Sequence, residues 1–163
     1  MKEKTVITIG KLLRQRALKL STAESCSGGR LADHITDIPG SSDYFVGGVV
    51  AYAYEAKVAL LNVSWGTLRQ YGAVSREIVL EMARGVRSVL GADIGVSLSG
   101  IAGPSGGTPD KPVGTTWIGL SARDGDWARK FVWGGDRRAN KESSAQAALQ
   151  FVLDYLNGKP TNG

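Results

Sequence analysis

Segments with helical periodicity alternate with short apolar segments along almost the whole chain. Apolar positions three to four residues apart predict helices, and short runs rich in Val, Ile and aromatic residues predict strands. The expected helices cover about 4–19, 30–35, 55–61, 64–71, a segment that opens at Ser75, and 137–156; the expected strands cover 20–23, 44–53 and 94–99, followed by a hairpin of 113–122 and 127–133. This order predicts an α/β fold: a three-layer α/β/α sandwich with a mixed, mostly parallel sheet.

Length and composition describe one ordinary domain over residues 1–163, with 42% hydrophobic and 21% charged residues. Cys26 is the single cysteine, so no intrachain disulfide can form, and a reducing compartment is favoured. No stretch approaches the roughly 18 apolar residues of a membrane span, and the N-terminus lacks the apolar segment of a signal peptide. We therefore expect a cytoplasmic protein with no membrane partner.

The chain is basic, with a formal net charge of +5. Basic chains often bind nucleic acid, but here Lys and Arg are dispersed and form no dense run. A small anionic substrate, such as a nucleotide phosphate, explains a few extra basic residues equally well, and so does solubility alone. We expect a small-molecule nucleotide substrate and no nucleic-acid partner.

The first candidate for chemistry is the segment from Thr22 to Gly29, where small hydroxyl and thiol residues stand between a strand and a glycine-rich helix start. Free N–H groups at such a turn can stabilise an anion, which suits a nucleophile whose attack generates an oxyanion. The alternative is structural: Ser25 or Ser27 caps the helix and does nothing else.

The second candidate is Lys57, just beyond the apolar strand, with Tyr52 nearby. Desolvation lowers the pKa of an ammonium group, and a neutral lysine can act as a base. The alternative is a solvated helix lysine beside a core tyrosine.

The third candidate is the glycine- and proline-rich loop over residues 100–111. Backbone amides in such loops can wrap a phosphate, although the spacing fits neither a Walker loop nor a dinucleotide fingerprint. A wide structural turn is the alternative. His34 is the single histidine and Cys26 stands alone, so we expect no metal site and no cofactor.

Seven segments, in this order and over nearly the whole chain, resemble motifs of the CinA C-terminal-domain family. They are Thr22–Gly29, Ile38–Ser42, Tyr52–Lys57, Tyr71–Ser75, Ser97–Gly107, Lys111–Thr115 and Gly135–Arg137. Each motif alone is short and weak, whereas the ordered set is specific.

The family includes stand-alone nicotinamide mononucleotide deamidases, which belong to pyridine-nucleotide recycling in NAD salvage. The resemblance therefore implies an amidohydrolase that converts the carboxamide of nicotinamide mononucleotide to nicotinate mononucleotide and ammonia. It implies a metal-independent mechanism in which Ser25 is the nucleophile, Lys57 the base and Tyr52 the adjacent tyrosine. It also implies a homo-oligomer, with a dimer favoured.

We expect further contacts with the substrate in two places. N–H groups of Cys26 and Ser27 would hold the oxyanion, and the phosphate would lie at the glycine-rich loop and Arg137. The complete set of expected substrate-binding residues is Thr22, Cys26, Ser27, Gly28, Gly103, Ser105, Gly106, Gly107 and Arg137.

The sequence departs from the family at two points and leaves three rivals open. Family members often carry Thr in place of Ser27 and Ser-Asn in place of Ala53-Tyr54, which concerns substrate positioning. Cys26 is intrinsically the better nucleophile, and Glu24 would supply the acid of a Cys-Lys-acid site. Rivals of other classes are a non-catalytic module that binds a pyridine nucleotide for regulation and, because of the charge of +5, a nucleic-acid-binding domain.

Overall fold

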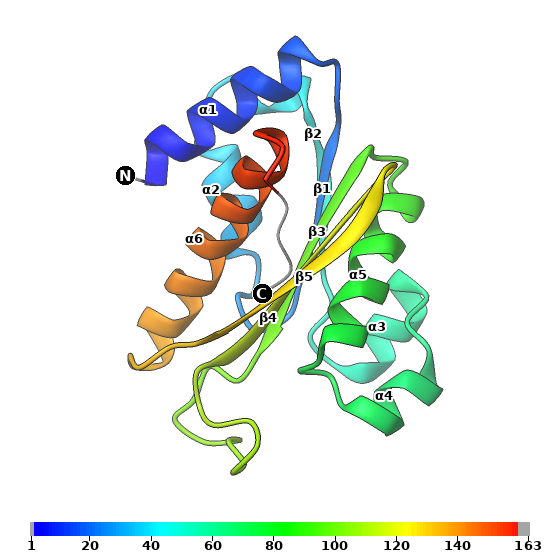
Figure 1. Ribbon diagram of the computed structural model, residues 1–163, viewed down its shortest axis with the longest axis vertical. Coiled ribbons are helices and arrows are strands. Elements are labelled where there is room, and N and C mark those ends of the chain that lie inside the picture. Colours follow the sequence, from blue (N-terminus) through cyan, green and yellow to red (C-terminus); the bar gives the residue numbers. More distant parts are fainter. Residues whose placement is uncertain (1, 160–163) are drawn as a thin grey trace.

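The computed structural model describes residues 2–159, which form six α-helices and five strands with a short 3-10 helix. The elements are α1 (Lys2–Gln15), β1 (Leu20–Glu24), α2 (Arg30–Thr36), the 3-10 helix (Ser41–Asp43), β2 (Phe45–Val50), α3 (Tyr54–Leu61), α4 (Trp65–Tyr71), α5 (Arg76–Val89), β3 (Ile94–Gly100), β4 (Thr115–Ala122), β5 (Gly125–Val132) and α6 (Arg137–Leu156). Figure 1 shows α1, α2 and α6 on one side of the sheet and α3, α4 and α5 on the other. The predicted three-layer α/β/α sandwich is confirmed.

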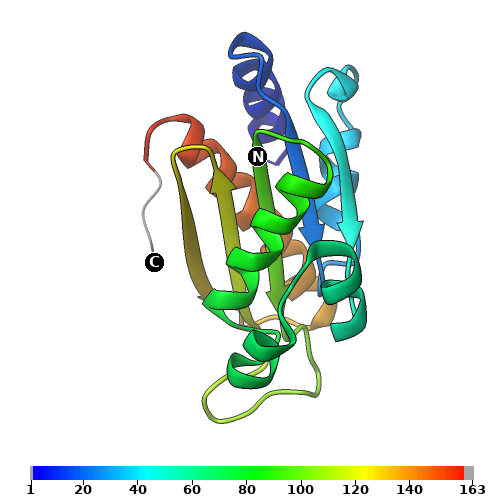
Figure 2. The same ribbon diagram turned by 90° about the vertical axis from the view of Figure 1, so that its right-hand side faces the viewer.

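The sheet has the strand order β2-β1-β3-β4-β5. β1 pairs in parallel with both β2 and β3, whereas β4 pairs antiparallel with both β3 and β5. β4 therefore runs against the other four strands, and the sheet is mixed and mostly parallel, as predicted. Because β1, β2 and β3 point the same way, their carboxyl ends meet at one edge, which is the lower edge in Figure 2.

The two faces of β3 show why the layers pack as they do. Ile94, Val96 and Leu98 belong to the larger apolar core under α1, α2 and α6. On the opposite face, a Cβ added at Gly95 would lie 2.2 Å from the Ala83 carbonyl oxygen of α5. Glycine at this position therefore lets α5 lie directly on the sheet.

Element types match the expectation, and the boundaries differ locally. The first helix ends at Gln15 rather than near 19, because Ala17 takes a left-handed conformation (φ 54°) and Leu20 already starts β1. The strand expected over 44–53 ends at Val50, since Ala53 caps α3. Ser75 caps α5 as predicted, its Oγ accepting from the N–H of Ile78. Within residues 2–159, no helix is long and apolar enough to cross a membrane.

Candidate active site

Ser25 and Lys57 meet at the carboxyl edge of the parallel strands. Ser25 directly follows β1, and its N–H donates to the carbonyl oxygen of Leu98 at 3.1 Å, which continues the pairing with β3. Lys57 lies in the first turns of α3, which follows β2. Adjacent parallel strands thus deliver both side chains to one point, although 32 positions separate them.

The ammonium nitrogen of Lys57 has three oxygen neighbours. Nζ lies 3.0 Å from Ser25 Oγ, 2.8 Å from the carbonyl oxygen of Ala51 and 3.1 Å from that of Tyr52. The side chain is 1% exposed, so the predicted desolvation of Lys57 is confirmed and the solvated alternative is wrong. Burial lowers the pKa of Lys57 from 10.5 to about 8, because desolvation penalises the charged form.

Glu24 is a structural carboxylate. It is buried, and it accepts hydrogen bonds from the Ser27 hydroxyl and from the N–H groups of Gly29, Leu31 and Ala32. These contacts use both carboxylate oxygens to hold the turn between β1 and α2. Glu24 therefore positions the segment that carries Ser25, and its lone pairs are committed to that turn rather than to a thiol or amine.

The turn between β1 and α2 also leaves donors free. In the part of the chain that the structure describes, the N–H groups of Cys26 and Ser27 have no oxygen acceptor. They directly follow Ser25, so they are available to an oxyanion formed at its hydroxyl. The Ser27 side chain itself is buried and engaged with Glu24, so its predicted contribution to substrate binding is reduced to the backbone.

Among the described residues, Cys26 makes no hydrogen bond to Ser25 or Lys57 through its thiol, although it lies close enough to Lys57 for their charges to affect each other. Its side chain is buried in the apolar core on the α6 side, beside Gly100, whereas Ser25 faces Lys57 of α3. Burial raises the pKa of the Cys26 thiol to about 11, so almost no thiolate is present at neutral pH. This geometry disfavours the rival in which Cys26 is the nucleophile.

Arg137 links three segments at the rim of the site. Its guanidinium donates to the carbonyl oxygen of Gly103 at 2.8 Å and to the Tyr52 hydroxyl at 3.2 Å. Tyr52 is 62% exposed, and its contact with Lys57 is through the main-chain carbonyl rather than the hydroxyl. The predicted residues Tyr52, Gly103 and Arg137 are thus brought together, while Arg137 is already engaged with two neutral oxygens.

The other loop residues predicted at the phosphate lie further out. Ser105, Gly106 and Gly107 are exposed, and the loop is held at its far side by Lys111, whose Nζ donates to the carbonyl oxygen of Tyr71 at 2.7 Å. Their contact with a phosphate stays a prediction.

A contact between Thr22 and the substrate stays a prediction, which the burial of this residue does not support. Thr22 lies within β1, is 0% exposed and faces α2, with its hydroxyl against Gly48 and no hydrogen-bond partner. Alternation along β1 explains this, since Thr22 and Glu24 point to the α2 face whereas Ser25 turns toward α3. Gly28, by contrast, is exposed at the turn, and its contact with the substrate stays a prediction.

Lys141 is a residue that the sequence did not single out. It stands on α6, with its Nζ 3.5 Å from where a Cβ at Gly28 would be. Lys141 and the turn over residues 27–29 line a cleft of about 400 Å³ together with Arg30 and Asp33. The two segments are more than 110 positions apart, so only the fold brings them together.

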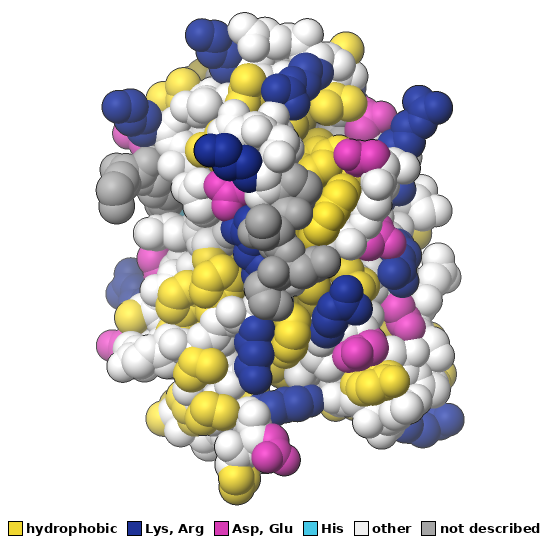
Figure 3. Space-filling view, in the orientation of Figure 1, with side chains coloured by type: hydrophobic (Ala, Val, Ile, Leu, Met, Phe, Trp, Pro, Cys, Tyr) yellow, Lys and Arg dark blue, Asp and Glu magenta, His cyan; other side chains and the backbone are white. Residues whose placement is uncertain are grey.

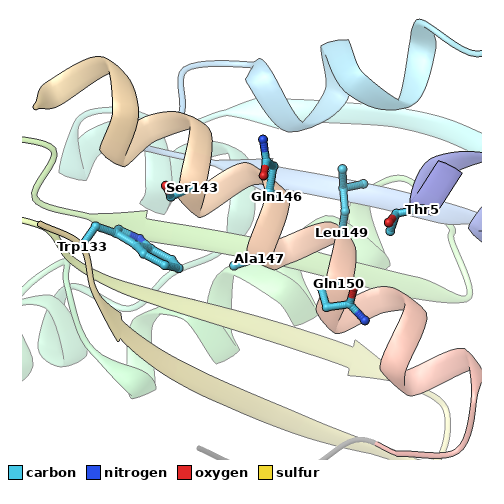
Figure 4. Close-up of a pocket in the computed structure, with 7 residues that line it drawn as sticks. All are labelled: Thr5, Trp133, Ser143, Gln146, Ala147, Leu149 and Gln150. Carbon is cyan, nitrogen blue, oxygen red and sulfur yellow. The ribbon is translucent and has the colours of Figure 1, made fainter. Parts of the chain in front are cut away.

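Two further features lie outside the dyad. A cavity of about 330 Å³ opens between α1, α6 and the end of β5 and is lined by Thr5, Trp133, Ser143, Gln146, Ala147, Leu149 and Gln150 (Figure 4). On α2, ligand atoms of Asp33, His34 and Asp37 lie within 4.8 Å of one another, but both aspartates are exposed and His34 is held by Glu142 at 3.0 Å. Neither feature shares a residue with the Ser25–Lys57 pair.

Basic side chains are scattered on the face seen in Figure 3, where Lys and Arg alternate with acidic and apolar groups. The dispersion expected from the sequence therefore holds on that face.

The fold and the site define a class: a three-layer α/β domain with a buried Ser–Lys pair at the carboxyl edge of its parallel strands. Residues 2–156 match the model of the CinA C-terminal domain, and the chain belongs to this family.

Known relatives support this membership. The chain is 50% identical over 149 residues to a "putative competence-damage inducible protein" of Halothermothrix orenii and 48% identical over 154 residues to a "CinA-like protein" of Chlorobium limicola. Each alignment covers 91% of this chain but 36% of the relative, so the chain spans about a third of their length.

Two solved structures align with this chain over nearly the whole length of both chains. A CinA superfamily protein from Klebsiella pneumoniae superposes with a TM-score of 0.93 at 32% identity, covering 97% of this chain and 99% of that one. The competence/damage inducible protein CihA from Agrobacterium tumefaciens gives a TM-score of 0.91 at 37% identity, with coverage of 96% and 95%. The fold is therefore that of these solved structures over nearly their whole resolved length.

Proposed function

We propose that this protein is a nicotinamide-nucleotide amidase, which hydrolyses the carboxamide of nicotinamide mononucleotide to nicotinate mononucleotide and ammonia. The observation that carries the proposal is the 3.0 Å contact between Lys57 Nζ and Ser25 Oγ in a buried setting that depresses the lysine pKa. A serine becomes a useful nucleophile when a positioned base can take its proton.

The hydrogen-bond partners of Lys57 suit a neutral amine. Carbonyl oxygens can only accept, so two N–H bonds of an –NH₂ group satisfy those of Ala51 and Tyr52. The nitrogen lone pair then remains for the O–H of Ser25. In this protonation state, Lys57 is oriented as a general base toward the nucleophile.

The first half of the reaction acylates the enzyme. Ser25 Oγ attacks the carboxamide carbon while its proton passes to Lys57 Nζ, and the N–H groups of Cys26 and Ser27 stabilise the oxyanion. Lys57 then returns the proton to the leaving nitrogen, the C–N bond breaks and ammonia departs. The product of this half is a nicotinate mononucleotide ester of Ser25.

The second half mirrors the first. Water attacks the ester carbonyl, Lys57 accepts a proton from that water, and the same N–H groups hold the second oxyanion. Collapse breaks the bond to Ser25 Oγ, which regains its proton from Lys57. Lys57 thus carries every proton in the proposed cycle, the backbone N–H groups stabilise the oxyanions, and the cycle as proposed uses no metal or cofactor.

The substrate assignment is tested with purified protein and nicotinamide mononucleotide under reducing conditions, before and after exhaustive chelation. We expect equal release of ammonia and nicotinate mononucleotide in both cases. If folded protein releases neither, the enzyme proposal fails. If activity requires a divalent metal, the Ser–Lys mechanism fails.

A non-catalytic nucleotide-binding role is the second candidate, because relatives carry names that refer to competence and damage induction. Binding of nicotinamide mononucleotide without any turnover, in wild-type protein, would favour it. A buried lysine beside a serine is costly for a simple binder, which is why we favour the enzyme. The expected cytoplasmic location and homo-oligomer stay predictions.

A further inference from the structure

Three basic residues stand in the first two turns of α6, at Arg137, Arg138 and Lys141, and no acidic residue lies in its first turn. The N-terminus of a helix carries a partial positive charge, so basic side chains there are unfavourable in the absence of an anion. Asp136 caps the helix by accepting from the N–H of Ala139 at 2.8 Å, and this capping role occupies one of its oxygens. The local charge is therefore arranged for a negatively charged ligand.

Among residues 2–159, the side chains of Lys141 and of the exposed Arg138 have no hydrogen-bond or ion-pair partner, and Lys141 is the more buried of the two. Arg30 pairs with Glu142 at 3.7 Å and donates to the carbonyl oxygen of Arg138, and Arg137 donates to Gly103 and Tyr52. Among residues 2–159, no carboxylate and no hydrogen-bond acceptor contacts Lys141 Nζ. Its side chain is half-buried, and its ammonium nitrogen lies next to the turn at Gly28.

The space that Lys141 faces is open because of a glycine next to the nucleophile turn. Gly28 has φ +64°, and its N–H donates to the carbonyl oxygen of Ser25 at 3.1 Å. A side chain at this position would enter the 3.5 Å gap toward Lys141 Nζ. The cleft of about 400 Å³ is lined by Ser27, two positions after Ser25, and by Gly28 and Lys141, with Arg30 and the Asp33 carboxylate on its α2 side.

We propose that Lys141 binds the phosphate of the nucleotide substrate in this cleft and so sets the preference for a nucleotide over its nucleoside. The proposal rests on the proposed amidase function and specifies how that site chooses its substrate. The carboxamide would lie at Ser25, the phosphate at Lys141, and the ribose across Gly28. Arg137 then acts as a positioning residue, which ties Tyr52 to the loop at Gly103.

The test compares Lys141→Met with Lys11→Met. Both substitutions remove one positive charge and keep a long unbranched side chain, but Lys11 is exposed on α1. Turnover of nicotinamide mononucleotide and of nicotinamide riboside is measured for each variant. We expect Lys141→Met to lower kcat/KM for the nucleotide by about ten- to a hundredfold, chiefly through KM, since the lost contact is charge-assisted.

The proposal is decided by comparing these variants on the nucleotide and on the riboside. Riboside turnover should stay unchanged in Lys141→Met, Lys11→Met should behave as wild type, and Lys141→Arg should recover most of the nucleotide preference. Equal losses on nucleotide and riboside, or no loss on either, would overturn the role of Lys141 while leaving the amidase function intact.

A binding measurement separates this proposal from the reaction. Calorimetry with the product nicotinate mononucleotide should show weaker binding to Lys141→Met than to wild type, by the same ten- to hundredfold. If that difference is found and no ammonia is released, the phosphate site stands and the amidase function fails. If nicotinate mononucleotide binds both proteins equally, the phosphate site fails.

Discussion

Lys57 meets Ser25 at 3.0 Å through a nitrogen whose two other partners are both carbonyl oxygens. A protonated Lys57 has three hydrogens for three oxygens, so it donates to Ser25 and cannot take its proton. A neutral Lys57 satisfies the carbonyls and accepts from Ser25. The geometry is compatible with both protonation states, and only the neutral one activates the serine.

The pH dependence of turnover follows from this pair. Because burial lowers the pKa of Lys57 to about 8, the active neutral form should increase as pH rises through that value. We expect kcat/KM for the amide to rise with pH and level off above about pH 8–9. Lys57→Arg keeps the charge but offers no usable base, so it should lose more than about a thousandfold in kcat. If Lys57→Arg keeps near-normal turnover, the general base is a residue other than Lys57.

Stability should also rise with pH because of the same lysine, over the range between its folded and unfolded pKa values. The folded-state pKa is lowered, so between about pH 8 and 10.5 the unfolded chain binds a proton that the folded chain does not. The free energy of unfolding should therefore rise with pH across this window, by about 3 kcal/mol at most. Lys57→Met removes the titration, and denaturant unfolding from pH 7 to 10 should show wild type gaining stability relative to this variant. If the difference in free energy of unfolding between wild type and Lys57→Met is the same at every pH, the pKa of Lys57 is not lowered by folding.

The neighbouring residues Ser25 and Cys26 give a clean comparison. Ser25→Ala should abolish turnover because it removes the nucleophile. Nucleotide binding and folding should persist, since only one small hydroxyl group is lost. Cys26→Ala should keep most of the activity and lose roughly 1 kcal/mol of stability, because the thiol packs in the core. Activity assays and thermal melts of both variants test this, and the reverse ranking would give Cys26 the catalytic role.

Much of the fold could be predicted from local patterns. Helical periodicity gave α5 and α6, and Ser75 was recognisable as a cap because its side chain acts within one turn. Errors arose where conformation depends on contacts beyond the local segment, as at Ala17, whose left-handed backbone ends α1 early. The burial of Thr22 was not evident from the sequence for a similar reason, since its face of β1 is covered by α2.

The site was less predictable from residues alone. The pattern of α3 left a desolvated and a solvated Lys57 both open, because its burial results from α3 packing beside β2. The Ser25–Lys57 pairing came from the resemblance to a family, and the structure supplied its geometry. No local signal marked Lys141, which becomes notable only once α6 lies against the turn at Gly28.

Glu24 should matter for folding and not for chemistry. Its oxygens accept from the Ser27 hydroxyl and three N–H groups, so Glu24→Gln would turn an amide –NH₂ toward donors. We expect the free energy of unfolding to fall by about 1–3 kcal/mol.

In the folded variant, the pH at which the rate levels off should stay where it is in wild type. A displaced inflection would instead couple Glu24 to the titration of Lys57.

The roles of Arg137 and Tyr52 can be separated by a double-mutant cycle. If Arg137 positions Tyr52, then Arg137→Ala and Tyr52→Phe should each lower kcat/KM on nucleotide and riboside alike, and their effects should not add. Should Arg137→Ala impair only the nucleotide, Arg137 binds the phosphate directly, as the sequence suggested.

The carbonyl partners of Lys57 have an evolutionary consequence. Ala51 and Tyr52 hold the lysine through main-chain oxygens, which every amino acid provides. Substitution of their side chains, and of Ala53 and Tyr54 beyond them, leaves the orientation of the base intact as long as the backbone path is kept. This segment can therefore diversify to suit different ligands while the reaction is inherited unchanged.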